Sequence, residues 1–320
     1  MCNKKKGDVM ELVVHLNSLK FVGDFIDIGV KYFVVGTKYF SCRQALSLDY
    51  DELAKLKARL GENKLWVLVN ALIEESNVEA VEKHLLRLNE LMVDGIVFQD
   101  FGVLEICKEN NYEFEMMYNP DTLNTNQATL NYLATLGVNS AFLAREIPLD
   151  EKMVIANETM LKTMVQVHGV EYMAYSKRKL LSNYFKEIGI DHGVLFDDGL
   201  TIQANGVDYG CHIYEDKFGC HILSERQICC LDVLSSFSDF DYLYIESLYI
   251  DDLKLVELTN YYYDALQSIK QGNYGKVSKE LMGQLSQLEK NVAYHHSFMF
   301  DATVYKIDDV RKREENEKRK

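Results

Sequence analysis

The stretch MVQVHGVEYMAYSKRKLLSNYF, residues 164–185, joins two kinds of sequence in one segment. Its first part is an apolar, β-branched run that ends at His168 and Gly169, and its second part is rich in Lys, Arg, Ser and Tyr. A short, nearly continuous apolar run is typical of a buried strand. We therefore predict a strand over residues 163–168 and expect the architecture to change after His168.

Six similar apolar runs precede this strand, and amphipathic stretches separate them. Between Val78 and Leu88, for example, apolar residues recur at helical spacing. Strands that are buried on both faces of a parallel sheet read as continuous Val, Ile and Leu runs. The alternation predicts an α/β fold, a TIM-type (β/α) barrel, with a doubly wound open sheet as the alternative. The predicted strands are 11–16, 32–36, 65–70, 95–100, 114–119, 140–144 and 163–168.

The sequence pattern in the second half of the chain predicts an insertion, followed by a strand that closes the barrel. After His168 the sequence reads as a helix and short antiparallel strands, with candidates at 194–196, 209–216 and 219–223. The run 242–247 would close the barrel as strand eight, which makes the antiparallel part an insertion between strands seven and eight. Whether the barrel is complete stays open. The expected divisions are strands one to seven (1–168), an insertion with a basic helix and a β-hairpin (169–240), closure with C-terminal helices (241–305) and a charged tail (306–320).

Composition narrows the class of protein. No apolar run reaches the roughly 18 residues that a membrane span requires, and Asp8 and Glu11 interrupt the basic N-terminal segment before any long apolar region. Seven irregularly spaced cysteines fit a reducing compartment. We therefore expect a cytoplasmic protein that does not contact a membrane. The net charge of −14 disfavours a broad nucleic-acid surface, so a polyanion would have to meet a local basic patch.

Polar residues end most of the predicted strands, and in a TIM-type barrel the carboxyl ends of the strands surround the site. Arg145 beside Glu146 resembles pairs in which a guanidinium holds a substrate carboxylate bidentately, although a salt bridge between loops is the alternative. Any single polar residue at a strand end could also be an ordinary transition into a loop, without a role in a site. We predict catalytic roles for His168, Glu146 and Glu246, substrate-binding roles for Arg145, Asn119 and Asp100, and a place at the same mouth for Asn70.

A cluster of four residues, Ser176, Lys177, Arg178 and Lys179, is the strongest local positive charge inside the chain. Tyrosines interleave with it, among them Tyr172. Proteins that bind nucleic acids combine cations, which contact phosphates, with aromatic rings, on which bases stack. We assign these five residues to substrate binding, with a solvated helix start as the alternative.

Other kinds of site find little support in the sequence. Neither GxSxG nor HExxH occurs, so the common hydrolase motifs are missing. A zinc site built from Cys211, His212, Cys220 and His221 is disfavoured, because adjacent residues in a strand point to opposite faces. We predict no metal site.

Several segments together resemble the U32 peptidase family, over about nine tenths of the chain. The strongest are 164–185 and the LARE motif at 143–146, and the others include GTKYFSCR (36–43), VNALIEE (69–75), YNPDTLNTNQAT (118–129) and YEDKFGCHILSERQICCLDVL (214–234). Within the family, the chain resembles the shorter, cysteine-poor companion subunits of tRNA 5-hydroxyuridine proteins. The resemblance implies a subunit for tRNA wobble uridine 5-hydroxylation, with prephenate as hydroxyl source, tRNA as a partner and a cysteine-rich U32 homologue as the second subunit.

Two other functions remain open beside this one. The family name implies a collagenase-like peptidase, a hydrolase in which His168 and Glu146 would activate water. The third possibility is a non-catalytic scaffold that stabilises a cluster-bearing homologue.

Several members of the family hold an iron–sulfur cluster on four cysteines. The resemblance places two of those cysteine positions at Tyr172 and Lys179 of this chain, and only Cys229 matches a family ligand. One thiolate cannot hold a cluster that requires about four. We therefore expect no cofactor to be bound by this chain alone, and a structural role for Cys229.

Overall fold

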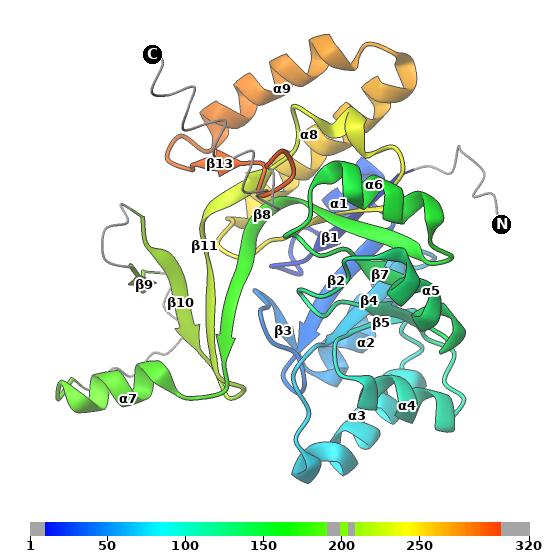
Figure 1. The fold of residues 1–320 in the computed structure, drawn as a ribbon, viewed down its shortest axis with the longest axis vertical. Helices are drawn as coiled ribbons and strands as arrows, with labels where there is room; N and C mark the ends of the chain where they lie inside the picture. The colour runs from blue at the N-terminus through cyan, green and yellow to red at the C-terminus, as the bar shows by residue number, and fades with distance from the viewer. Residues whose placement is uncertain (1–9, 191–198, 204–208, 302–320) are drawn as a thin grey trace, which may run out of the picture.

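The computed structural model describes residues 10–190, 199–203 and 209–301 of the 320-residue chain, and its centre is a closed ring of parallel strands. The ring closes because β12 pairs in parallel with both β1 and β8. The predicted TIM-type barrel is thus confirmed, including its closure by the strand near residue 242. The ring strands are β1 (Glu11–His15), β2 (Tyr32–Thr37), β4 (Lys64–Val69), β5 (Gly95–Phe98), β6 (Glu115–Tyr118), β7 (Ser140–Phe142), β8 (Lys162–Ser176) and β12 (Tyr242–Ile245) (Figure 1).

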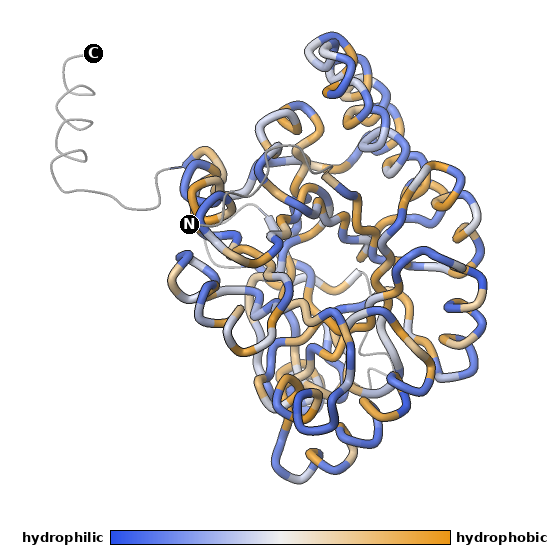
Figure 2. The backbone as a smooth tube through the Cα atoms, turned by 90° about the vertical axis from the view of Figure 1, so that its right-hand side faces the viewer, coloured by the Kyte–Doolittle hydropathy of each residue, from blue (hydrophilic) through white to orange (hydrophobic). Residues whose placement is uncertain are grey.

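Helices surround the ring, and α9 packs against α8 on its outer side. Leu53, Leu56 and Leu60 form the buried stripe of α2, whose first turn is stabilised by a capping box of Asp49 and Glu52. The tube in Figure 2 accordingly alternates hydrophilic and hydrophobic colour along the outer helices. The helices are α1 (Val22–Ile28), α2 (Tyr50–Leu60), α3 (Val78–Glu90), α4 (Phe101–Glu109), α5 (Gln127–Thr135), α6 (Leu149–Glu158), α8 (Asp252–Gln271) and α9 (Tyr274–Leu288), with short 3-10 turns η1 (Glu75–Asn77) and η2 (Leu234–Phe237). Among the described helices, none has the length and apolar character to cross a bilayer.

The core has two layers because side chains alternate across each strand. Inside the ring, Trp66 packs edge-on against Tyr242, with ring centroids 5.1 Å apart. Between ring and helices lies a larger cluster that includes Val14, Phe33 and Val67. Side chains fill the barrel interior, so a ligand of the barrel itself would bind at an end of the ring.

Strand β8 continues well beyond the ring, and this differs from the predicted end at His168. Its outer part pairs with β11 (Cys220–Cys229), which pairs with β10 (Cys211–Glu215) and through it with β9 (Thr201–Ile202). Together with α7 (Leu180–Glu187) these strands form a projection, here called the arm (Figure 1). Gly169 permits the continuation, since it has φ +98° and a Cβ there would lie 2.5 Å from the carbonyl oxygen of Glu246.

Two short strands complete the described structure. β3 (Ser47–Leu48) pairs with β2, and β13 (Tyr294–His295) pairs in parallel with β11. The predicted strand at 194–196 and the charged tail at 306–320 lie outside the described residues.

Candidate functional site

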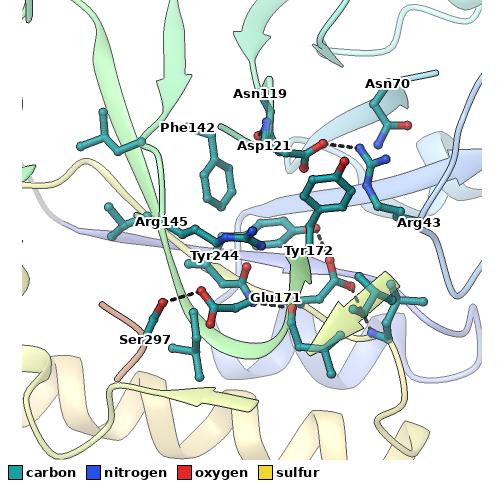
Figure 3. A pocket seen from close by; sticks show the side chains of 18 of the residues that line it. Arg43, Asn70, Asn119, Asp121, Phe142, Arg145, Glu171, Tyr172, Tyr244 and Ser297 are labelled. Carbon is teal, nitrogen blue, oxygen red and sulfur yellow. Dashed lines mark hydrogen bonds and ion pairs between the residues drawn. The ribbon is translucent and has the colours of Figure 1, made fainter. Parts of the chain in front are cut away.

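A pocket opens at the carboxyl ends of the ring strands, next to the point where the arm leaves the barrel (Figure 3). Its walls come from the loops after β2, β4, β6 and β7 and from β8 and β12. Five residues singled out in the sequence line it together: Asn70, Asn119, Arg145, Tyr172 and Glu246. Strand-end polar residues therefore do converge on one place, here called the mouth pocket.

One wall of the mouth pocket is an ion pair that the sequence did not single out. Arg43, after β2, donates from Nη2 to Oδ2 of Asp121, after β6, over 2.6 Å, and both side chains are largely buried. Burial disfavours both charges: it raises the pKa of Asp121 against the opposing effect of Arg43, whereas the carboxylate of Asp121 outweighs burial and raises the pKa of Arg43. Both residues have positive φ, 55° and 64°, which requires that the surrounding loops hold them in place.

The opposite wall carries a guanidinium without a carboxylate. Among the described residues, Nε and Nη1 of Arg145 are buried without a hydrogen-bond partner, and Nη2 donates to the carbonyl of Met173 over 3.5 Å. Figure 3 shows the side chain extending toward Tyr172, whose ring centre is 5.6 Å from Arg145 and 4.8 Å from Arg43. Unmatched buried donors are costly, and the planar fork of Arg fits a carboxylate or phosphate. This wall is suited to an anionic ligand.

Glu246 closes the pocket from the end of β12. It accepts hydrogen bonds from the amides of Ser247 at 2.8 Å and Leu248 at 3.0 Å, and it lies 2.8 Å from Nδ1 of His15. Burial opposes its charge, but His15 and these amides outweigh burial and hold the pKa of Glu246 below its ordinary value. The group is an ionised hydrogen-bond acceptor, which the hydroxyl of Tyr244 contacts at 3.2 Å.

A second cation lies beneath Arg145. Lys152, on α6, is 2% exposed, lines the pocket and donates to the carbonyl of Arg145 over 3.4 Å. Burial lowers its pKa to about 8, although Cys230, Glu171 and Glu146 act in the opposite direction. The nearby carboxylate of Glu171 already accepts from Ser297 over 2.6 Å. Two cations, Arg145 and Lys152, and the carboxylate of Glu171 thus lie on this side of the pocket.

His168 does not reach the mouth pocket, contrary to its predicted position there. A register shift between β8 and β12 places Tyr244 opposite Gln166 and Ile245 opposite His168, which breaks the simple alternation. His168 is fully buried, with Nδ1 3.2 Å from the hydroxyl of Tyr262 on α8. Burial lowers its pKa to about 3 against the opposing effect of Gln227, so the imidazole is neutral. This geometry gives no support to an acid–base role.

Two other predicted residues also lie outside the lining of the pocket. Asp100 caps α4, accepting from Gly102 at 2.9 Å, and also accepts from the amide of Ile73 at 3.0 Å. Glu146 follows Arg145 without lining the pocket, and its Oε2 has no hydrogen-bond partner among the described residues. The predicted catalytic role of Glu146 therefore has no support from this geometry.

The basic cluster lies at the end of the arm, from Ser176 at the end of β8 through the turn that precedes α7. The cluster therefore comes before the helix and is not part of it. Arg178 and Lys179 are exposed, and the amide of Arg178 donates to Ser176 Oγ over 3.2 Å. Lys177 forms an ion pair with Glu74 on the barrel at 2.5 Å. Lys177 and Lys179 line a second hollow, which is separate from the mouth pocket.

The family's iron–sulfur cluster does not fit the residues that are present. Tyr172 lies in the mouth pocket, whereas Cys229 is buried, and Tyr262 donates to its Sγ over 3.8 Å. Burial raises the pKa of Cys229 to about 11, so the thiol is protonated. No three His, Cys, Asp or Glu side chains are grouped to hold a metal ion in the described part of the chain.

Sequence comparison identifies relatives of this chain among known proteins. The chain is 28% identical over 308 residues to tRNA hydroxylation protein P2 of Bacillus subtilis, which covers 92% of this chain and 99% of that protein. It is 23% identical over 303 residues to an uncharacterized protease of Methanocaldococcus jannaschii, covering 91% of this chain and 73% of that one. It is also 27% identical over 153 residues to tRNA hydroxylation protein P of Escherichia coli, covering 45% of this chain and 34% of that one. The profile of peptidase family U32 matches residues 17–307, and the chain belongs to this family.

Proposed function

We propose that this chain is one subunit of a cytoplasmic tRNA hydroxylation system that acts on wobble uridine together with a cysteine-rich member of its family. Its mouth pocket binds a small organic carboxylate. Prephenate, the hydroxyl source that the family resemblance implies, is the first candidate. The RNA part of the proposal is supported by the Bacillus subtilis relative, which matches almost end to end and is named a tRNA hydroxylation protein.

The observation that carries the carboxylate part is the unmatched guanidinium of Arg145. Arg145 and Lys152 both line the mouth pocket, and two buried donors of Arg145 lack a partner among the described residues, whereas Arg43 and Glu246 already have partners. A bound carboxylate would give at least one of these donors a partner, because the two bidentate forks of a guanidinium combine Nη2 with either Nε or Nη1. The rings of Tyr172 and Phe142 supply apolar surface for the rest of the molecule.

A peptidase function has less support from the same geometry. His168 is buried against α8 and neutral, and Glu146 does not line the pocket. A water molecule in the mouth pocket would contact neither of these two groups. We therefore prefer the hydroxylation subunit to the hydrolase.

Mass spectrometry of tRNA nucleosides tests the function in cells. Deletion of the gene should remove 5-hydroxyuridine and its derivatives, and the wild-type gene should restore them. Complementation with Arg145→Met should fail, whereas Arg59→Met, at an exposed arginine of α2, should restore the modification.

The outcomes separate the alternatives. Unchanged tRNA after deletion would reject the proposal. Full restoration by Arg145→Met would reject the ligand-binding part and favour a scaffold. With purified protein, prephenate should bind to the wild type, and Arg145→Met should weaken binding about 10-fold to 100-fold, the effect expected for loss of a hydrogen bond to a charged group.

A further inference from the structure

A groove runs between the arm and the rim of the barrel, beside the mouth pocket. Its empty volume is about 1290 Å³, part of which is open to solvent. Tyr39 and Leu72 line it from the loops after β2 and β4, and Lys217 and Phe218 line it from the hairpin between β10 and β11. The same two barrel loops carry Arg43 and Asn70 into the mouth pocket, so these loops contribute residues to both the groove and the pocket.

The groove is basic although the protein is acidic. Its lining contains four lysines, Lys83, Lys177, Lys179 and Lys217, and one carboxylate, Glu74, in a chain of net charge −14, and Lys83 also pairs with Glu79 beside the groove at 2.6 Å. Lys177 and Glu74 form an ion pair in which both side chains are about half exposed. Exposed pairs of this kind contribute little to stability, so a phosphate can replace the carboxylate at small cost. The groove is therefore a local anion-binding surface.

Flat rings form the barrel side of this groove. Tyr39 and Tyr50 stack with centroids 4.4 Å apart and planes at 14°, and His84 lies 5.3 Å from Tyr39. Burial, and then the charge of Lys217, lower the pKa of His84 to about 4, so this ring is neutral. Its Nδ1 is 2.9 Å from the hydroxyl of Tyr50, which fixes the two rings relative to each other. The three rings therefore form a packed aromatic surface beside the lysines.

We propose that this groove binds a single-stranded segment of RNA, with phosphates on the lysines and bases on the rings of Tyr39 and Phe218. Lysines that follow a backbone, combined with aromatic platforms, are the combination that single strands require. A duplex hides its base faces within the stack and would use only the charges. The inference rests on the proposed function, for which it names the surface that receives the unpaired part of the tRNA.

Fluorescence anisotropy with the purified full chain tests the charges. The probes are fluorescent oligouridine and a duplex RNA of equal length, each titrated at several salt concentrations. The double variant Lys179→Glu with Lys217→Glu should bind oligouridine at least about 10-fold more weakly, and its salt slope should fall by about 0.7 for each lost phosphate contact. The matched control, Lys276→Glu with Lys279→Glu on the exposed side of α9, should bind as the wild type does.

A second variant tests the rings without changing charge. Tyr39→Leu should weaken oligouridine binding by roughly 10-fold and leave the salt slope unchanged, because a stacking partner is lost and no phosphate contact is. Circular dichroism of each variant checks that it is folded. Wild-type affinity in the folded lysine variant, equal affinity for duplex and single strand, or no RNA binding by the wild type would each overturn the proposal.

The two proposals can fail separately. If deletion of the gene leaves tRNA nucleosides unchanged but the lysine variant loses oligouridine, the proposed function falls and the groove stands. If deletion removes 5-hydroxyuridine but RNA binds independently of Lys179, Lys217 and Tyr39, only the groove is rejected.

Discussion

Arg43 and Arg145 lie on either side of the same tyrosine ring, but they are in opposite electrostatic situations. Arg43 has a carboxylate at 2.6 Å, whereas two buried donors of Arg145 have no partner among the described residues. Breaking a buried pair leaves an uncompensated charge, while an unmatched donor is a cost that a ligand can remove. The comparison separates a wall that holds the pocket together from a wall that is prepared for a ligand.

The largest expected effect is on the Arg43 side. Arg43→Met leaves the Asp121 carboxylate buried without its counter-ion, and the free energy of unfolding should fall by about 3–5 kcal/mol. Urea unfolding followed by circular dichroism measures the change. The double variant Arg43→Met with Asp121→Leu should recover most of the lost free energy of unfolding, because no buried charge is then left without a counter-ion. A single variant within about 1 kcal/mol of the wild type would contradict the assignment of a structural pair.

Arg145→Met should behave differently in the same unfolding experiment. Without ligand, its free energy of unfolding should stay within about 1 kcal/mol of the wild type or rise, because the unmatched donors are removed. Added prephenate should raise the melting temperature of the wild type and not of the variant, since a ligand stabilises only the state that binds it. Equal stabilisation of both proteins would place the ligand elsewhere and remove the contrast between the two walls.

The smallest expected effect is a pH dependence from Lys152. Its pKa is lowered to about 8, so the ammonium is charged below that pH and neutral above it. Carboxylate affinity should therefore fall several-fold between about pH 7 and 9, and Lys152→Met should flatten the profile. The free energy of unfolding should rise with pH over the window between about 8 and 10.5, because the unfolded chain still binds the proton there. Calorimetric titration across pH checks the first trend and urea unfolding the second.

The barrel could be predicted from sequence because its strands are buried on both faces. Continuous runs such as those of β2 and β4 have few alternatives once helical stretches separate them. The extension of β8 was missed because Gly169 read as an end. In the structure, this glycine allows the chain to pass the carbonyl of Glu246 and continue as a strand.

The site was predictable only in part, for physical reasons that individual residues show. Asn70, Asn119 and Glu246 follow their strands directly, and Arg145 follows the predicted strand 140–144, although β7 itself ends at Phe142. His168 also ends an apolar run, but the register shift against β12 turns it toward α8.

Arg43 and Asp121 were missed because each lies inside a loop, away from a strand end. The available signal was their opposite charge within two family-like segments, 36–43 and 118–129. The two residues are 78 positions apart in the sequence, so only the tertiary structure brings them together. The periodicity of apolar residues identifies local helices and strands and does not report such a contact.

The continuity of β8 has a geometric consequence for the two proposed ligands. Tyr172 in the pocket and Lys177 at the groove are five positions apart along this chain segment, so at roughly 3.3 Å per residue they are separated by about 17 Å. Hydrogen bonds to β11 hold most of that length as sheet. The spacing between a nucleotide and a small molecule would then be set by backbone geometry, and an insertion or deletion between these two residues would shift one ligand relative to the other.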